Sequence, residues 1–235
     1  LSQRFEILLS RSESREIKRL ARNLRTTLFN LLSSFVAILL YRYFGREKLA
    51  INYPCSIRPG DFDDSFAFYI NNLPLKIDLS ENPSVRELLS RVNKQCKSDR
   101  KYNFISLIDI MHSLKSVSNI DHRAFNISLS QTELELPKFT FNNIECKFYA
   151  DSFRVNASKD DLSFLFVDGD DGIKMHLEYN TLCFSQDYIS SLVGNFKNLL
   201  LNIKDDVDQN IDSLEFISPK EVAMISNFNH CNVAR

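Results

Sequence analysis

The stretch LFNLLSSFVAILLY, residues 28–41, carries apolar side chains on every side of a helix. Such a helix has no polar face for water, so it is buried inside a domain between other elements. Thr26 or Thr27 supplies its N-cap, and Gly45 predicts a left-handed stop at its C-terminus. The stretch is shorter than the roughly 20 residues that cross a bilayer, and Arg42 follows it. We therefore expect a core helix and no membrane as a partner.

The rest of the chain alternates between strand and helix periodicity. Strands are predicted at 4–10, 49–57 and 125–129, and a hairpin of two strands at 162–180. Residues 133–160 are predicted to form short strands at an edge of the sheet or crossing elsewhere. Helices are predicted at 10–24, 84–96, 104–114 and 185–203. Capping signals lie at Ser10 or Ser12 and at Ser84 with Glu87. A chain of 235 residues that is 44% hydrophobic can bury a large core. We predict one layered domain of α/β (mixed α+β) class, with helices packed on a mixed sheet.

The stretch FAFYINNLPLKIDL, residues 66–79, has the composition of a strand but is interrupted by Asn71, Asn72 and Pro74. Proline cannot donate a hydrogen bond to a strand ladder, and asparagine and proline are frequent in turns. Periodicity alone therefore predicts a turn between two strand segments.

Charge is distributed unevenly along the chain. Residues 1–58 hold 11 Lys and Arg against 4 Asp and Glu, although the net charge of the whole chain is −1. Spacings of four and three residues place five of the basic side chains on one helical face: Arg11, Arg15, Lys18, Arg22 and Arg25. Two interpretations remain open, a solvated outer face and a docking stripe for an acidic partner. Nucleic acid is disfavoured as a partner, because the pI is near 6.5 and no aromatic residue interrupts the stripe.

Several kinds of site are absent from the sequence. The 5 glycines form no phosphate-binding loop, and the 4 histidines form neither an HxxxD arrangement nor a zinc-ligand pair. The loop that begins at Asp168 fails as a calcium loop, because Gly172 occupies its fifth position and Tyr179 its twelfth. We predict a turn there, and a solvated strand position for His176. No catalytic or metal-binding residue is predicted in this chain.

The cysteines are odd in number and contain no CxxC pair. They are Cys55, Cys96, Cys146, Cys183 and Cys231. This pattern predicts reduced thiols in a cytoplasmic protein. Because the chain begins at Leu1 and has no signal segment, we expect it to be a piece of a longer polypeptide.

Four stretches, taken in order, resemble the C-terminal half of the condensation domains of nonribosomal peptide synthetases. Residues 27–59 resemble that family's buried helix, glycine stop and following strand, and residues 66–79 resemble its GFFVNTLPLR motif. SVRELLSRV (84–92) is similar to the helix that follows, and residues 176–200 are similar to the closing hairpin strand and helix. The tail ISPKEVAMISNFN is similar to the segment that leads into an adenylation domain.

The resemblance implies one lobe of a two-lobe fold like that of chloramphenicol acetyltransferase, with a tunnel between the lobes. Residues 1–218 would be the C-terminal lobe and residues 219–235 a linker toward an adenylation domain. The catalytic HHxxxDG motif of the family belongs to the N-terminal lobe, and this chain does not contain it. The implied partners are that N-terminal lobe, peptidyl carrier proteins and the adjacent adenylation domain. No cofactor would be bound by this chain, because the carrier proteins present the phosphopantetheine arms.

The resemblance also implies a set of tunnel-lining residues. Asn71 matches the asparagine of the family motif, Asn72 replaces its threonine, and Tyr69 lies just before them. These side chains would face the phosphopantetheine arm or the substrate. The family's HQDxPFE pattern has become roughly RKYNFIS at residues 100–106. The alternative function is a non-catalytic interaction module that binds a carrier protein or a neighbouring synthetase domain through the basic stripe.

Overall fold

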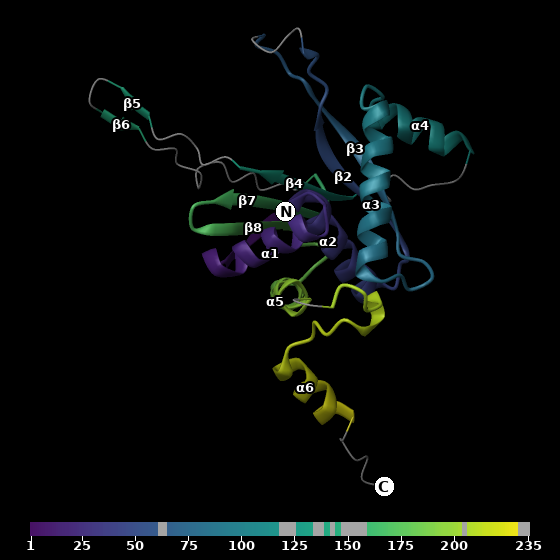
Figure 1. Ribbon diagram of the computed structural model, residues 1–235, viewed down its shortest axis with the longest axis vertical. Helices are drawn as coiled ribbons and strands as arrows, with labels where there is room; N and C mark the ends of the chain where they lie inside the picture. The colour runs from purple at the N-terminus through teal and green to yellow at the C-terminus, as the bar shows by residue number, and fades with distance from the viewer. Residues whose placement is uncertain are drawn as a thin grey trace.

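A computed structural model describes residues 1–60, 65–117, 126–133, 139–141, 144–146, 159–203 and 206–229 (Figure 1). The strands are β1 (Ser2–Leu9), β2 (Lys48–Ser56), β3 (Ile70–Asp78), β4 (Ile127–Thr132), β5 (Phe139–Phe141), β6 (Ile144–Cys146), β7 (Leu162–Gly169) and β8 (Gly172–Asn180). The helices are α1 (Arg11–Asn23), α2 (Leu28–Phe44), α3 (Val85–Asp99), α4 (Leu107–Val117), α5 (Gln186–Asn202) and α6 (Pro219–Asn229), with 3-10 turns at Arg100–Tyr102 and Ile211–Ser213.

Six strands form one mixed sheet in the order β1-β8-β7-β4-β2-β3, and β5 and β6 pair separately. The pairs β4–β7 and β2–β4 are parallel, and the other pairs of the large sheet are antiparallel. Helices α1, α2, α3 and α5 lie over one face of the sheet (Figure 1). The predicted fold class, helices packed on a mixed sheet, is confirmed.

Helix α2 is the centre of the core, as its composition predicts. Every residue from 30 to 40 is buried, and the helix contacts α1, α3, α5 and β4. Thr27 is the N-cap, because its hydroxyl accepts a hydrogen bond from the Asn30 N–H at 3.1 Å. Gly45 ends the helix with φ at 66°, a left-handed conformation that glycine adopts without steric penalty.

The other helices begin where short capping patterns predict. Ser10 and Glu13 form a reciprocal capping box at the start of α1, and Ser84 and Glu87 form another at the start of α3. The predicted helix at 104–114 begins later, at Leu107, because the Ser106 hydroxyl accepts from the Asp109 N–H at 3.1 Å and so caps the first turn.

The predicted interruption of the strand at residues 66–79 is wrong. Strand β3 runs without a break through Asn71, Asn72 and Pro74, and pairs with β2 over its whole length. Because β3 is the edge of the sheet, the missing N–H of a proline on its outer side breaks no ladder bond. The residues before the strand do not extend it, and Phe66 and Phe68 are fully or largely exposed there.

The predicted hairpin is formed by β7 and β8. Its inward residues Ile173, Met175 and Leu177 are fully buried, and the Gly169–Gly172 pair closes the turn. The predicted strand at 125–129 is β4, although Phe125 lies outside the described residues. Of the edge strands predicted for 133–160, the structure describes β5 and β6 as a separate pair, and most of the remaining segment also lies outside the described residues.

Within the described residues, no single helix has the length and apolar composition needed to cross a membrane. Helices α1 and α2 meet those criteria only when taken together, and the chain bends by 102° between them.

Candidate functional site

The candidate site lies on the face of the sheet opposite the helices. Along each strand, the side chains that alternate with the buried core residues point to this open face. Ser163 and Leu165 of β7 are two of them, and both are only half-buried. Two polar contacts cross between neighbouring strands there. The Ser128 hydroxyl donates to the Ser163 hydroxyl at 3.0 Å, and the His176 Nδ1 lies 2.9 Å from a carboxylate oxygen of Glu6. The side chain of His176 is 19% exposed, so it is more enclosed than the sequence predicts.

A cavity of about 270 Å³ lies on this open face, where strands β2 and β4 meet. The two strands pair only at Asn52 and Ser128, so their side chains leave room on either side of that contact. The cavity is lined by Asn72 of β3, Ser128 of β4, and the oppositely charged pair Lys159 and Asp160. Its walls can therefore accept and donate hydrogen bonds and carry charge of both signs.

Of the three predicted tunnel residues Tyr69, Asn71 and Asn72, Asn72 lines this cavity. Its side chain is exposed on β3, directly across from Pro54 of β2. Alternation along the strand points Asn71 toward the helix side. There its amide nitrogen donates to the backbone carbonyls of Asn103 and Ile105, each at 2.7 Å. Asn71 therefore holds the loop between α3 and α4 against the edge strand.

Tyr69 lies at the base of the connection between β2 and β3. Its hydroxyl lies 2.8 Å from the Ser65 hydroxyl, and the guanidinium of Arg58 is stacked 4.5 Å from the ring centre. The Arg58 guanidinium also donates to the Ser65 carbonyl at 2.7 Å. These contacts fix Tyr69 within its own loop. Contact of Tyr69, Asn71 or Asn72 with a substrate remains a prediction.

The basic stripe on α1 is partly neutralised by the β7–β8 turn. Arg11 pairs with Asp171 at 3.0 Å and Lys18 pairs with Asp168 at 2.6 Å. The other three members of the stripe, Arg15, Arg22 and Arg25, are exposed and make no ion pair within the described part of the chain. Arg11, Arg15, Lys18 and Arg22 lie on α1 as the spacing predicts, but the placement of Arg25 on the same helical face is wrong, because α1 ends at Asn23 and Arg25 follows the C-cap with φ at 51°. The carboxylates that pair with Arg11 and Lys18 come from a segment about 150 residues away.

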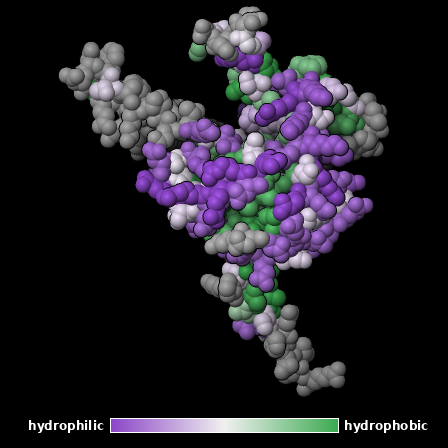
Figure 2. Space-filling view, in the orientation of Figure 1, coloured by the Kyte–Doolittle hydropathy of each residue, from purple (hydrophilic) through white to green (hydrophobic). Residues whose placement is uncertain are grey.

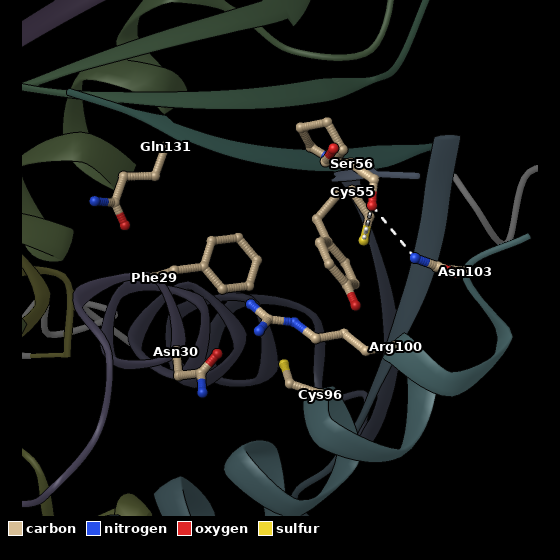
Figure 3. A pocket seen from close by; sticks show the side chains of 10 residues that line it. Phe29, Asn30, Cys55, Ser56, Cys96, Arg100, Asn103 and Gln131 are labelled. Atoms are coloured by element: carbon tan, nitrogen blue, oxygen red, sulfur yellow. Dashed lines mark hydrogen bonds between the residues drawn. The ribbon is translucent and has the colours of Figure 1, made fainter. Parts of the chain in front are cut away.

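A second cavity, of about 400 Å³, lies between the start of α2, the end of α3 and the end of β2 (Figure 3), and Pro54 lines both cavities. Sequence patterns do not reveal it, since its lining residues come from four separate segments. The phenol of Tyr53 is buried there, and burial raises its pKa, with smaller contributions in the same direction from Cys96, Asp99 and Cys55 and an opposing one from Arg100. Burial likewise raises the pKa of the Cys96 thiol to about 11, so the thiol is protonated at neutral pH.

The described residues provide little catalytic equipment of their own. Among them, no group of three or more His, Cys, Asp or Glu side chains is placed to hold a metal ion. Cys55, Cys96 and Cys183 are free thiols. The arrangement can bind and orient a ligand by hydrogen bonds, and two of these thiols, Cys55 and Cys96, line the second cavity.

Comparison with known proteins assigns the family. The condensation domain family matches residues 2–226, so this chain belongs to the condensation domains of nonribosomal peptide synthetases. Malpinin synthetase of Mortierella alpina is 25% identical over 219 residues, which cover 90% of this chain and 3% of that protein. A dimodular nonribosomal peptide synthase of Bacillus subtilis (strain 168) is 30% identical over 221 residues, which cover 88% of this chain and 9% of that protein. The chain thus spans a small part of the length of these relatives.

Solved structures share the fold. A four-domain nonribosomal peptide synthetase bound to AMP and glycine superimposes with a TM-score of 0.81 at 17% identity, over 94% of this chain and 18% of that one. The X-domain from teicoplanin biosynthesis gives a TM-score of 0.75 at 20% identity, over 92% of this chain and 50% of that one. The first condensation domain of the CDA synthetase gives 0.73 at 14% identity, over 92% and 48%.

Proposed function

We propose that the chain is the C-terminal lobe of a nonribosomal peptide synthetase condensation domain, with a two-lobe architecture like that of chloramphenicol acetyltransferase. The observation that carries this proposal is the length of this chain relative to solved domains of the same fold. The chain covers 48% of a solved condensation domain and 50% of an X-domain while nearly all of its own residues align. Its sequence also has no adjacent pair of histidines and so no HHxxxDG motif. The missing half would supply that motif.

In this proposal, the open face of the sheet is one wall of the tunnel between the lobes. A phosphopantetheine arm is narrow and carries amide groups, which suit the Asn72 amide and the Ser128 hydroxyl of the cavity. The acceptor amine attacks the donor thioester carbonyl, a C–N bond forms, the C–S bond breaks, and the thiol leaves on the donor arm while the amine loses a proton. This chain would contribute orientation and exclusion of water, since half of a cleft positions no base.

An exposed apolar patch supports the presence of a covering lobe. It lies at the start of β3 and on the adjoining α3–α4 loop and α4, where the side chains of Phe66, Phe68, Ile70, Phe104 and Ile108 are 108, 83, 52, 73 and 65% exposed. Figure 2 shows apolar surface in this upper part of the molecule, near the β2–β3 arm and α4. A soluble monomer seldom exposes so many large apolar side chains together. The isolated chain should therefore self-associate, and a clean monomer in light scattering over a wide concentration range would count against the covering lobe.

The proposed domain division places the lobe at 1–218 and a linker toward an adenylation domain at 219–235. Helix α6 extends away from the body (Figure 1), and Val222, Ile225 and Phe228 on it are half or more exposed. Its first turn is held by Glu221, whose carboxylate accepts from the Ser218 hydroxyl at 2.8 Å. A helix with exposed apolar side chains is suited to contact a following domain.

The cheapest test is the sequence encoded before Leu1. About 200 residues is an ordinary size for one lobe. An HHxxxDG motif within that upstream segment is the expected finding. A start codon immediately before Leu1, or an unrelated domain there, would refute the lobe assignment and favour the alternative function.

That alternative is a non-catalytic module that binds an acidic carrier protein or neighbouring domain through the basic stripe. The observation in its favour is that Arg15, Arg22 and Arg25 are exposed and unneutralised within the described residues. Binding would weaken steeply with salt. Arg22→Gln should weaken carrier-protein binding, whereas Arg19→Gln, which removes the same charge from another face of α1, should leave it unchanged. Equal effects of the two substitutions would exclude a docking role for the stripe.

A further inference from the structure

Strand β1 has one unpaired edge. It is the outermost strand of the six-stranded sheet, and within the described part of the chain it pairs with β8 alone. Arg4, Glu6 and Leu8 are exposed along it, whereas Phe5 and Ile7 are half-buried against the core. The unpaired edge of a sheet presents a row of backbone N–H and C=O groups with which another strand can pair.

The hydrogen bonds to β8 show which backbone groups of β1 face this edge. The ladder of the two strands continues at Leu1, whose carbonyl accepts from the Thr181 N–H at 3.1 Å. Because hydrogen-bonded pairs alternate along an antiparallel ladder, the odd-numbered residues of β1 turn their backbone groups toward β8. The backbone groups of the even-numbered residues Arg4, Glu6 and Leu8 therefore point outward, and among the residues that the structure describes they have no backbone partner.

A second copy of β1 fits this edge in one favourable register. Two equal strands that pair about a two-fold axis run antiparallel. Outward backbone groups must meet outward groups, so even-numbered residues lie opposite even-numbered residues. One such register places Arg4 opposite Glu6 of the second copy, and symmetry repeats the pair. A shift of the register by two residues in either direction places Arg4 opposite Arg4 or Glu6 opposite Glu6, and like charges directly opposite each other are destabilising.

The side chains on both faces of β1 suit this register. On the open face, one carboxylate oxygen of Glu6 lies 2.9 Å from His176 Nδ1, and its other oxygen can accept from a guanidinium. Arg4 forms no ion pair within the described ranges. On the helix side, Phe5 would lie on the two-fold axis opposite its own copy. Its ring is partly exposed in the single chain, and an aromatic pair across two strands is stabilising.

We propose that β1 pairs antiparallel with β1 of a second copy of this chain, so that two six-stranded sheets join into one continuous sheet. Arg4 of each chain pairs with Glu6 of the other. The interface consists of one strand from each chain and is small, so the dimer forms reversibly at high protein concentration. None of its residues lines the cavity beside Asn72 or belongs to the exposed apolar patch, so this proposal can fail while the proposed function holds.

Disulfide trapping tests the register. Arg4→Cys and Glu6→Cys chains are mixed, oxidised mildly and mapped by mass spectrometry, which separates the new link from links of the native cysteines. Residues directly opposite each other lie about 5.5 Å apart between Cα atoms, a distance that a disulfide spans. Two copies of the same substituted residue are diagonal neighbours, roughly 7 to 8 Å apart, which a disulfide does not span without backbone movement. The mixture should cross-link between positions 4 and 6 at least about tenfold faster than either variant cross-links to itself. Equal rates, or links at the native cysteines alone, would overturn the proposal.

Exchange of charges tests the same pairing without added cysteines. Arg4→Glu and Glu6→Arg each place like charges opposite each other at both symmetric positions, whereas the double variant restores opposite charges. The measurement is deuterium exchange of the outward amides of β1 at increasing concentration of the 235-residue chain, because pairing protects these amides. The concentration for half-maximal protection should rise about tenfold or more in each single variant and return to the parent value in the double variant.

The matched control is Arg19→Glu, which makes the same exchange of charge on an exposed face of α1 and should leave the protection of β1 unchanged. Protection in the parent chain that does not depend on concentration would overturn the proposal. Single variants that keep the parent behaviour, or a double variant that fails to recover it, would do the same.

Discussion

The substitution Asn71→Ala separates a structural role for this side chain from a role in binding substrate. It removes the two hydrogen bonds that the Asn71 amide donates to the carbonyls of Asn103 and Ile105, each 2.7 Å long. A hydrogen bond of this kind contributes a net 0.5 to 1.5 kcal/mol, so the pair predicts a loss of about 1 to 3 kcal/mol in the free energy of unfolding. The lower half of that range is expected, because both bonds are only partly buried and water can replace them.

The matched control is the neighbouring exposed amide. Asn72→Ala removes a side chain from the surface of β3 and should change the free energy of unfolding by less than about 0.5 kcal/mol. Urea denaturation of the two variants and the parent chain, monitored by circular dichroism, measures both values. If Asn71→Ala destabilised the chain no more than Asn72→Ala, the assignment of Asn71 to holding the α3–α4 loop would be wrong.

Two further substitutions test local features of the fold by the same denaturation assay. Gly172→Ala should lower the free energy of unfolding by about 2 kcal/mol or more, because φ is +128° and an added Cβ would clash with the Leu9 carbonyl oxygen. Gly45→Ala, with φ at +66° and open space around it, should lower it by less. The reverse order would contradict the packing at the hairpin turn. Hydrogen bonds from the Ser80 hydroxyl and N–H hold the pKa of Asp78 below its usual 3.8, so its stabilising contribution is present above that value and is lost as pH falls through the lower folded pKa. Asp78→Asn should therefore lose less stability than the parent between about pH 5 and pH 3, and identical pH profiles would refute this contribution.

The parts of the fold that the sequence predicted are those set by neighbouring residues. The burial of α2 follows from apolar side chains on all of its faces, and its ends follow from Thr27 and Gly45. The capping boxes at Ser10 and Ser84 are also local patterns. Each of these features depends on residues within about one helical turn, so periodicity and capping chemistry are sufficient to find them.

The course of β3 could not be predicted in this way. Whether Pro74 breaks a strand depends on whether the strand lies at an edge, and the edge is set by the order of all six strands. The same limit applies to the cavities. Tyr53 and Arg100 are 47 positions apart in the sequence, and only the packing of α3 against the sheet brings them together. The family resemblance assigns Asn71 and Asn72 to one tunnel motif, but alternation along the strand sends their side chains to opposite faces of the sheet.

In the proposed function, this chain is one wall of a condensation tunnel and needs the other lobe for chemistry. The most direct test measures amide formation between a donor and an acceptor presented on carrier proteins, by mass spectrometry of the intact carriers. It compares the 235-residue chain alone with the same chain extended by the segment encoded upstream. The account predicts amide product from the extended chain and none from the 235 residues alone. Product from the isolated chain, or from neither protein, would contradict it.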